Sequence, residues 1–308
     1  MDRSDHQDPS RIMRSAKKPP ARALALYNFS SLKYNPLIPT KKGIITMKRM
    51  IAMALAILML CGCFAGCQSI DKPTVVVGYT IYAPMNYLDE AGELIGFDTD
   101  LAKAVFEGLG YQVIFQEIDW DSKYTDLESG AIDCVWNGFT ANTADDDGVL
   151  RSEKVDFSYD YMENRQVIVC KKDLGELTAA DLTGKVAAVE SGSAGETYAG
   201  TFDGLTAKGF NKQTECLFEV NAGTADVAIV DAQLAKSYAG KGDYESLTII
   251  DGLSSEVEFY AIGFKKGSDL TAKVNEQLEK LAADGTIAKL AQTYGVETTA
   301  ITDFSDQK

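Results

Sequence analysis

The sequence predicts an α/β protein built as two doubly wound lobes joined by a two-strand hinge. Short apolar runs alternate with segments of helical periodicity, an order typical of a parallel sheet with helices on both faces. The pattern also recurs, because residues 127–136 and 220–229 both read apolar–x–small–Gly–x–apolar–Asp before a buried strand. Two such lobes facing each other form a cleft at the carboxyl ends of their strands, where ligands bind in sheets of this kind.

The first lobe is predicted to contain three strands and two helices before the chain leaves it. An Asp-Thr-Asp run at 98–100 precedes apolar residues at helical spacing, so we expect an N-cap carboxylate there and a C-cap at Gly110. A shorter helix is expected to end at Gly130. The predicted elements are strand 75–77, helix 101–109, strand 113–115, helix 124–129 and strand 132–136.

The second lobe repeats this order, and the chain then returns to the first. The predicted elements are strand 166–170, strand 186–189, a helix opened by the Ser-Gly-Ser turn at 191–193, strand 225–230, helix 232–238, a returning strand at 257–264, and helices 270–283 and 286–294. We therefore expect lobe 1 to comprise 67–164 and 259–308, and lobe 2 to comprise 165–258. A chain that crosses twice between lobes is wired like a hinge-bending clamp.

The charge of the chain is unevenly distributed and excludes several classes of function. The first 66 residues carry 3 acidic and 11 basic side chains, whereas residues 67–308 carry 42 acidic and 19 basic ones. A surface this acidic repels phosphate backbones, so we expect no nucleic-acid partner. The single histidine is His6, which excludes Ser-His-Asp and Cys-His catalysis and histidine-ligated metals from the globular part.

Residues 47–66 are interpreted as a secretory signal. A Lys-Arg pair precedes an uncharged apolar stretch of marginal length for a spanning helix. The stretch ends in Phe-Ala-Gly before Cys67, which resembles the lipobox of bacterial lipoproteins, in which the cysteine carries lipid such as palmitate. Cys63 is the alternative. Residues 1–46 are interpreted as non-native sequence upstream of a true start at Met47, or as a disordered leader.

The other cysteines and an acidic run are given structural interpretations. Cys134, Cys170 and Cys216 lack the spacing of a metal or redox motif, so they are interpreted as small buried hydrophobes. Their odd number leaves at least one thiol unpaired, and whether two of them pair stays open. The acidic run 145–147 lacks the Gly and Glu spacing of a calcium loop and is interpreted as a solvated loop.

Four motifs within residues 72–296 resemble one known family. They are GFDTDLA at 96–102, IDCVWNGFT at 132–140, VDFS at 155–158 and LAADGTIAKL at 281–290. In this order after a lipobox-like signal, they are similar to the family 3 extracellular solute-binding proteins of ABC importers for polar amino acids. The resemblance implies a type II periplasmic-binding-protein fold that closes on one free amino acid, with no cofactor and with ABC permease subunits as partners. We expect a monomer held outside the cytoplasm by its lipid.

The resemblance also implies which residues hold the amino acid. Its α-carboxylate would meet Arg151 and the start of a helix at Ser193 and Ala194, which suits an anion. Its α-ammonium would meet Asp231, which follows a buried strand; a plain helix cap is the alternative role. The other members are groups that complete the shell and aromatic rings beside it: Asn137, Gly138, Thr140 and Tyr82, with Trp136 and Phe139 in the pocket wall or in the core.

Two departures from the family pattern leave alternatives open. The segment between Thr140 and Arg151 is longer than usual, so Arg165 near the hinge is kept as the alternative carboxylate ligand. Ala194 stands where the family often has a hydroxyl, which leaves only a backbone N–H there. The alternative function is an enzyme on the same scaffold, resembling a dehydratase or a lytic transglycosylase.

Overall fold

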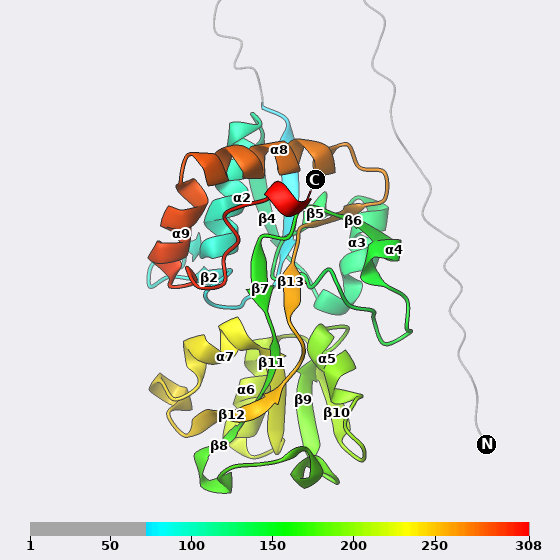
Figure 1. The fold of residues 1–308 in the computed structure, drawn as a ribbon, viewed down its shortest axis with the longest axis vertical. Coiled ribbons are helices and arrows are strands. Elements are labelled where there is room, and N and C mark those ends of the chain that lie inside the picture. The colour runs from blue at the N-terminus through cyan, green and yellow to red at the C-terminus, as the bar shows by residue number, and fades with distance from the viewer. Residues whose placement is uncertain (1–71, 308) are drawn as a thin grey trace, which may run out of the picture. The chain divides into compact units, whose positions relative to one another are not determined.

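The computed structural model describes residues 72–307, in which two five-stranded sheets form the centres of two lobes (Figure 1). Lobe 1 is the upper body in that view, and lobe 2 is the lower one. The predicted fold class, two α/β lobes joined by two connecting strands, is thereby confirmed. The predicted leader at 1–46, the signal at 47–66 and Cys67 lie outside the described residues.

The lobe 1 sheet has a parallel half and an antiparallel half. Its strands are, in sheet order, β4 (Gln112–Glu117), β1 (Thr74–Tyr79), β5 (Cys134–Val135), β14 (Gly263–Lys265) and β6 (Val155–Phe157). The first three run parallel, and β14 is antiparallel to both of its neighbours. Alternate β1 residues face opposite sides, since Val75 and Val77 join one core cluster and Val76 packs against another.

Helices cover both faces of the lobe 1 sheet. On one face, α2 (Phe97–Gly108) packs with α8 (Leu270–Ala283) and α9 (Thr286–Tyr294), so the last two helices return to the lobe where the chain began. On the other face, α3 (Lys123–Ser129) lies against β5 and β14. The remaining elements of this lobe are the short strands β2 (Tyr87–Leu88) and β3 (Leu94–Ile95) and the one-turn helix α4 (Arg151–Lys154).

The lobe 2 sheet comes from one continuous stretch of chain. Its strands are, in sheet order, β10 (Thr206–Phe210), β9 (Val186–Glu190), β11 (Val227–Asp231), β8 (Gln166–Lys171) and β12 (Leu247–Ser254). The first three are parallel, and β8 is antiparallel to β11 and β12. The helices that pack on this sheet are α5 (Ala194–Ala199), α6 (Gln213–Ala222) and α7 (Ala232–Tyr238).

Two strands connect the lobes. β7 (Met162–Asn164) and β13 (Glu258–Tyr260) pair antiparallel and run side by side between the two sheets (Figure 1). The returning strand expected at 257–264 is therefore two strands, β13 and β14. The break occurs because the Ala261 N–H donates to the Phe139 carbonyl, and pairing with the lobe 1 sheet begins only at Gly263.

The N-cap carboxylate predicted for α2 is wrong. The N-cap is Gly96, with a φ of 132°, and a Cβ there would lie 2.1 Å from the Met85 carbonyl oxygen. Asp98 lies inside the first turn and is buried. Its Oδ2 accepts hydrogen bonds from the Gly138 N–H at 3.0 Å and the Tyr161 hydroxyl at 2.9 Å. Burial raises the pKa of Asp98 to about 7, against the effect of these two donors.

Other boundaries follow local signals more closely. The C-cap of α2 is Leu109, and Gly110 follows it with a φ of 85°, one residue beyond the predicted cap. Within the predicted strand 132–136, only Cys134–Val135 forms a strand. The three helices expected at 232–238, 270–283 and 286–294 have the predicted bounds.

The three cysteines of the described residues are free and buried, which confirms their interpretation as small hydrophobes. Burial raises the pKa of the Cys134 thiol well above its usual value. Between residues 72 and 307, no helix combines the length and the apolar character needed to cross a membrane. The same residues contain no group of three or more His, Cys, Asp or Glu side chains placed to hold a metal ion.

Candidate functional site

A small polar cavity lies where strands of both lobes end. Its walls come from segments that follow β4 and β5 in lobe 1 and from the ends of β9 and β11 in lobe 2. The lining residues are Trp120, Asn137, Gly138, Thr140, Arg151, Glu190, Ser193, Ala194, Gln213 and Asp231. Seven of the eight residues predicted as ligand contacts therefore lie around one space, at the edge where doubly wound sheets bind ligands.

Arg151 enters the cavity from lobe 1 and is almost completely buried, with 1% of its surface exposed. Its Nε donates to Asp145 Oδ1 at 2.8 Å, and its Nη1 donates to the Thr140 carbonyl at 3.2 Å. Its Nη2 reaches the Gly192 carbonyl of lobe 2 at 3.4 Å. The guanidinium also stands 5.4 Å from the centre of the Phe139 ring. Arg151 thus connects the two lobes at the cavity wall.

The acidic run at 145–147 is only partly a solvated loop, which corrects the sequence interpretation. Asp145 is buried, and besides Arg151 it accepts hydrogen bonds from Lys154 Nζ at 2.8 Å and the Tyr124 hydroxyl at 2.6 Å. Burial alone would raise the pKa of Asp145, but Arg151 and the two other donors outweigh it and lower the pKa. Asp146 and Asp147 are exposed, as expected. The segment before Arg151 therefore supplies that residue's counterion.

Asp231 enters the cavity from lobe 2 as the last residue of β11, and it is 4% exposed. Its Oδ1 accepts from the side-chain amides of Asn164 at 2.7 Å and Gln166 at 2.6 Å, and its Oδ2 accepts from Gln213 at 2.5 Å. The side chain does not cap α7. Burial raises the pKa of Asp231, while the amide donors act in the opposite direction.

The start of α5 forms the other wall of lobe 2. Ser193 is the N-cap, and its Oγ accepts from the Glu196 N–H at 3.2 Å. Glu196 reaches back to accept from the Gly192 N–H at 2.7 Å, which fixes the turn before the helix. Ala194 is buried and lines the cavity with its backbone and methyl group.

The loop after β5 is held in place by contacts with neighbouring protein residues. Asn137 donates from Nδ2 to the Thr80 carbonyl at 2.8 Å and to Asn86 Oδ1 at 2.6 Å. Gly138 has a φ of 58°, and a Cβ there would lie 2.9 Å from the Tyr82 ring. The Thr140 hydroxyl donates to a carboxylate oxygen of Glu258 at 3.3 Å. These contacts fix the loop where Asn137, Gly138 and Thr140 line the cavity.

The three aromatic residues named from sequence lie behind the cavity wall. Tyr82 is buried, and its hydroxyl is 2.8 Å from that of Tyr260. Trp136 is fully buried and packs edge-on against Phe106 with ring centres 6.0 Å apart. Phe139 is also fully buried. Trp136 and Phe139 are therefore core residues, the alternative that the sequence left open, and Tyr82 does not line the cavity.

Three cavity residues were not predicted: Trp120, Glu190 and Gln213. Asp231 was identified from its position at the end of a strand, and the same signal applies to two of these three. Glu190 is the last residue of β9, and Trp120 follows the end of β4. The alternative carboxylate ligand, Arg165, is exposed and donates to the Ser255 carbonyl at 2.8 Å, away from the cavity.

A second cation borders the cavity. Lys123 is 2% exposed, and its Nζ donates to the carbonyls of Trp120 at 3.3 Å and Gly192 at 3.0 Å. The ammonium stands 4.6 Å from the centre of the Tyr124 ring. Burial, followed by the charge of Arg151, lowers the pKa of Lys123 to about 8. Lys123 and Arg151 thus both donate to the Gly192 carbonyl of lobe 2.

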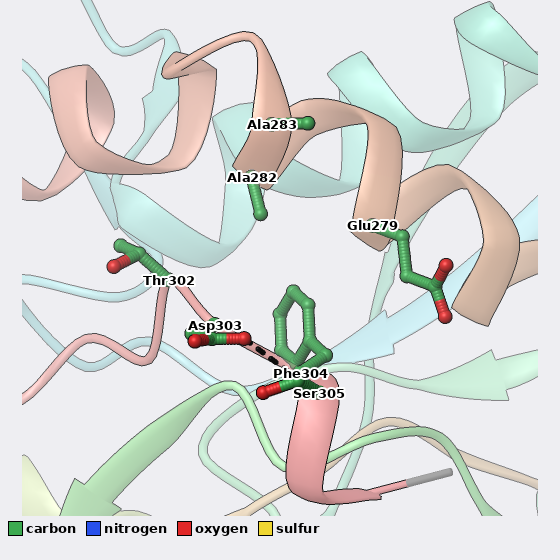
Figure 2. Close-up of a pocket in the computed structure, with 7 residues that line it drawn as sticks. All are labelled: Glu279, Ala282, Ala283, Thr302, Asp303, Phe304 and Ser305. Atoms are coloured by element: carbon green, nitrogen blue, oxygen red, sulfur yellow. Dashed lines mark hydrogen bonds between the residues drawn. The ribbon is translucent and has the colours of Figure 1, made fainter.

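A larger cavity lies at the surface beside α8 and is a weaker candidate. This cavity lies between the helix and the C-terminal segment and has a volume of about 260 Å³. Figure 2 shows the residues that line it: Glu279, Ala282, Ala283, Thr302, Asp303, Phe304 and Ser305. The Ser305 N–H donates to Asp303 Oδ1 at 2.9 Å (Figure 2). The lining contains no basic side chain that could pair with a carboxylate. All of its residues belong to lobe 1.

The comparisons with known proteins agree with the fold. The model of the bacterial extracellular solute-binding proteins, family 3, matches residues 75–297. The arginine-binding extracellular protein ArtP of Bacillus subtilis is 30% identical over 241 residues, which are 77% of this chain and 92% of that protein. The L-cystine-binding protein TcyA of the same species is 27% identical over 271 residues, 82% of this chain and 97% of that protein.

Solved structures give the same picture. An ancestral arginine-binding protein bound to arginine is 33% identical, with a TM-score of 0.66, and the match covers 73% of this chain and 99% of that one. The ancestral amino acid-binding protein AncCDT-1, a precursor of cyclohexadienyl dehydratase, is 31% identical, with a TM-score of 0.64 and coverage of 72% and 95%. The closely similar relatives are named as binding proteins rather than as enzymes.

We predict that Asp145→Asn destabilises the protein at neutral pH, because it leaves the buried Arg151 without its counterion. The expected loss in the free energy of unfolding is about 3 kcal/mol at pH 7. The folded protein lowers the pKa of Asp145, so the stabilisation is present above the unfolded value and is lost as the pH falls through the lower folded value. Urea unfolding between pH 7 and pH 3 should therefore show the two proteins converging in acid.

The neighbouring substitution Asp146→Asn is the control, because it removes the same charge from an exposed position. It should change the free energy of unfolding by no more than about 0.5 kcal/mol. Equal effects of the two substitutions would contradict the assignment of Asp145 as the partner of Arg151.

Proposed function

The chain belongs to the bacterial extracellular solute-binding proteins of family 3, and we propose that it binds a free polar amino acid between two closing lobes and delivers it to an ABC importer. Supporting this proposal, relatives are named for binding arginine, histidine or cystine. The observation that carries the proposal is that one cavity holds a buried guanidinium from lobe 1 and a buried carboxylate from lobe 2.

Those two groups match the two charges that every free amino acid carries. The Arg151 guanidinium suits the planar α-carboxylate, for which it offers a fork of donors. The Asp231 carboxylate suits the α-ammonium. Each group lies at the cavity wall and favours a ligand that places the opposite charge beside it, Arg151 in addition to its counterion Asp145. A simple amine or a simple acid would satisfy only one of the two.

The other lining residues complete the proposed shell. Carbonyl or hydroxyl groups at Asn137, Gly138 and Thr140 would accept from the ammonium. The N–H at Ala194, beside the Ser193 cap, would face the carboxylate. Tyr82 would support the ligand from behind Gly138, whose missing Cβ leaves the two in close contact.

We propose that the two lobes move about the paired strands β7 and β13, with lobe 1 comprising 67–164 and 259–308 and lobe 2 comprising 165–258. Contacts across the cavity favour the closed form, since Arg151 and Lys123 both donate to the Gly192 carbonyl. A further ion pair joins Glu117 of lobe 1 to Lys212 of lobe 2. A ligand that bridges Arg151 and Asp231 would add to these contacts only when the lobes are closed.

Lipid attachment at Cys67 would complete the proposed role. A lipid-anchored receptor stays at the outer face of the cell membrane, where a captured amino acid is presented to the permease subunits of the importer. Binding without catalysis is the proposed activity, so the ligand should be recovered unchanged after long incubation with the protein. Chemical conversion of the ligand would favour the alternative of an enzyme on this scaffold. One structural neighbour, a precursor of cyclohexadienyl dehydratase, motivates that alternative.

We predict that Arg151→Met and Asp231→Asn abolish most of the affinity for the ligand, which a thermal-shift screen of the twenty amino acids and cystine would first identify. Each substitution leaves one ligand charge without its buried partner. Calorimetric titration should show losses on the order of a hundredfold to several thousandfold.

Arg165→Met is the matched control for the carboxylate ligand, because Arg165 is exposed and outside the cavity. It should leave the dissociation constant within about threefold of that of the wild type. A folded Arg151→Met variant with unchanged affinity, beside a weakened Arg165→Met variant, would reverse the assignment of the two arginines.

Ligand-driven closure should be visible in solution. We predict that the radius of gyration measured by small-angle X-ray scattering falls when the ligand is added in saturating amount, because closure brings the lobes together about the hinge. The Asp231→Asn variant at the same ligand concentration should show a smaller change. Superimposable curves for the wild type with and without ligand would contradict the clamp.

The proposed anchor makes a separate prediction. Cys67→Ala should move the protein from the membrane fraction to the medium or the soluble fraction, because removal of the acylated cysteine removes the lipid. Cys63→Ala is the matched control and should remain membrane-bound. Release by Cys63→Ala with retention of Cys67→Ala would assign the lipid to the other cysteine.

A further inference from the structure

Glu190 is a buried acid that the binding of an α-amino and an α-carboxyl group leaves unused. It ends β9, lines the cavity and is 2% exposed. Its carboxylate oxygen Oε1 is buried and has no hydrogen-bond partner in the part of the chain that the structure describes. An unpartnered acceptor of this kind on a cavity wall marks a place where a donor from a ligand fits.

The nearby cations of the protein are engaged elsewhere. Lys123 directs its ammonium to two backbone carbonyls and the Tyr124 ring, and the ion pairs within residues 72–307 do not include one with Glu190. Arg151 is taken up by Asp145 and by the carbonyls of Thr140 and Gly192. The protein itself therefore leaves the Glu190 carboxylate without a close positive partner.

An amino acid with a neutral side chain does not use this acceptor. Its zwitterion supplies one positive and one negative group, which Asp231 and Arg151 match, and Glu190 Oε1 is left without a donor. Burial, followed by the charge of Asp231, raises the pKa of Glu190 to about 8, and Lys123 and Gln213 offset this only in part. A positive group on the ligand supplies a donor to Oε1 and favours the ionised form of Glu190.

We propose that Glu190 binds a positively charged side-chain group, so that the ligand is a basic amino acid whose side chain ends in a guanidinium or an ammonium. This inference rests on the proposed function, since it assigns the third charge of the same cavity. The Trp120 ring lines that cavity too, and aromatic faces attract cations and stack on guanidinium planes. Glu190 and Trp120 are thus the residues that set the side-chain specificity.

Matched pairs of ligands test this assignment directly. L-arginine and L-citrulline differ in whether the side chain ends in a charged guanidinium or a neutral ureido group, and L-lysine and L-norleucine differ in the ammonium. Calorimetric titration of the wild-type protein should show arginine or lysine binding at least about tenfold more tightly than its neutral counterpart. In Glu190→Gln, the basic ligand should lose at least about tenfold in affinity, while its neutral counterpart changes by less than about threefold.

Glu215→Gln is the charge-matched control, because Glu215 is exposed on α6 while the start of that helix lines the cavity. It should keep the wild-type preference. Glu190→Gln keeps the shape of the side chain and removes a buried acid whose Oε1 has no partner, so the melting temperature of the ligand-free protein should not fall. The wild-type comparison of ligands, moreover, needs no variant.

The possible failures are distinguishable. Tightest binding of a neutral or acidic amino acid, or equal binding of arginine and citrulline, would overturn the role of Glu190 and leave the proposed function intact. Equal losses for basic and neutral ligands in Glu190→Gln would also overturn it, since they indicate a structural role. If no amino acid of the full panel binds, both this inference and the proposed function fall.

Discussion

The need to compensate a guanidinium buried between two lobes governs the architecture of the site. Arg151 cannot be buried alone, because a charge removed from water requires partners. The segment before it provides them, with Asp145 placed against Nε and the Thr140 carbonyl against Nη1. The terminal nitrogens of the fork face the cavity and lobe 2. The segment between Thr140 and Arg151 thus holds the guanidinium in place.

The buried carboxylate on the opposite wall is compensated by neutral hydrogen-bond donors instead of a counterion. Asp231 is surrounded by three neutral amides, from Asn164 in the hinge, Gln166 in β8 and Gln213 in α6. Amide donors stabilise a carboxylate without cancelling its charge, so the negative potential remains available to a cation. One of these amides belongs to β7, and therefore the state of the hinge and the geometry of this carboxylate are directly coupled.

The sheets explain why such distant residues meet. Parallel strands end at one edge, and the loops that follow them supply most of the cavity wall. The loop after β5 is fixed from behind, with Gly138 donating to the buried Asp98 and fitting against Tyr82 without a Cβ. Rigid support of this kind reduces the conformational entropy that ligand binding must overcome.

Local sequence by itself determined the fold class and many of the elements. Helices α7, α8 and α9 have the bounds predicted from the sequence, because the signals that begin and end a helix act within a few residues. Arg151 and Asp231 were assigned from motif and strand-end position, and the structure brings both to one cavity. Their roles toward a ligand remain proposals.

Only the tertiary structure decided which side chains meet across that cavity. The acidic run at 145–147 reads as solvated, yet Asp145 is buried because Arg151 lies beside it. The sequence leaves Trp136 between the pocket wall and the core and gives Glu190 no role, whereas in the structure Trp136 is in the core and Glu190 lines the cavity. The physical reason is that burial and pairing depend on how segments pack once both sheets have formed, even for partners six residues apart such as Asp145 and Arg151. Periodicity and capping report on one turn or one strand at a time.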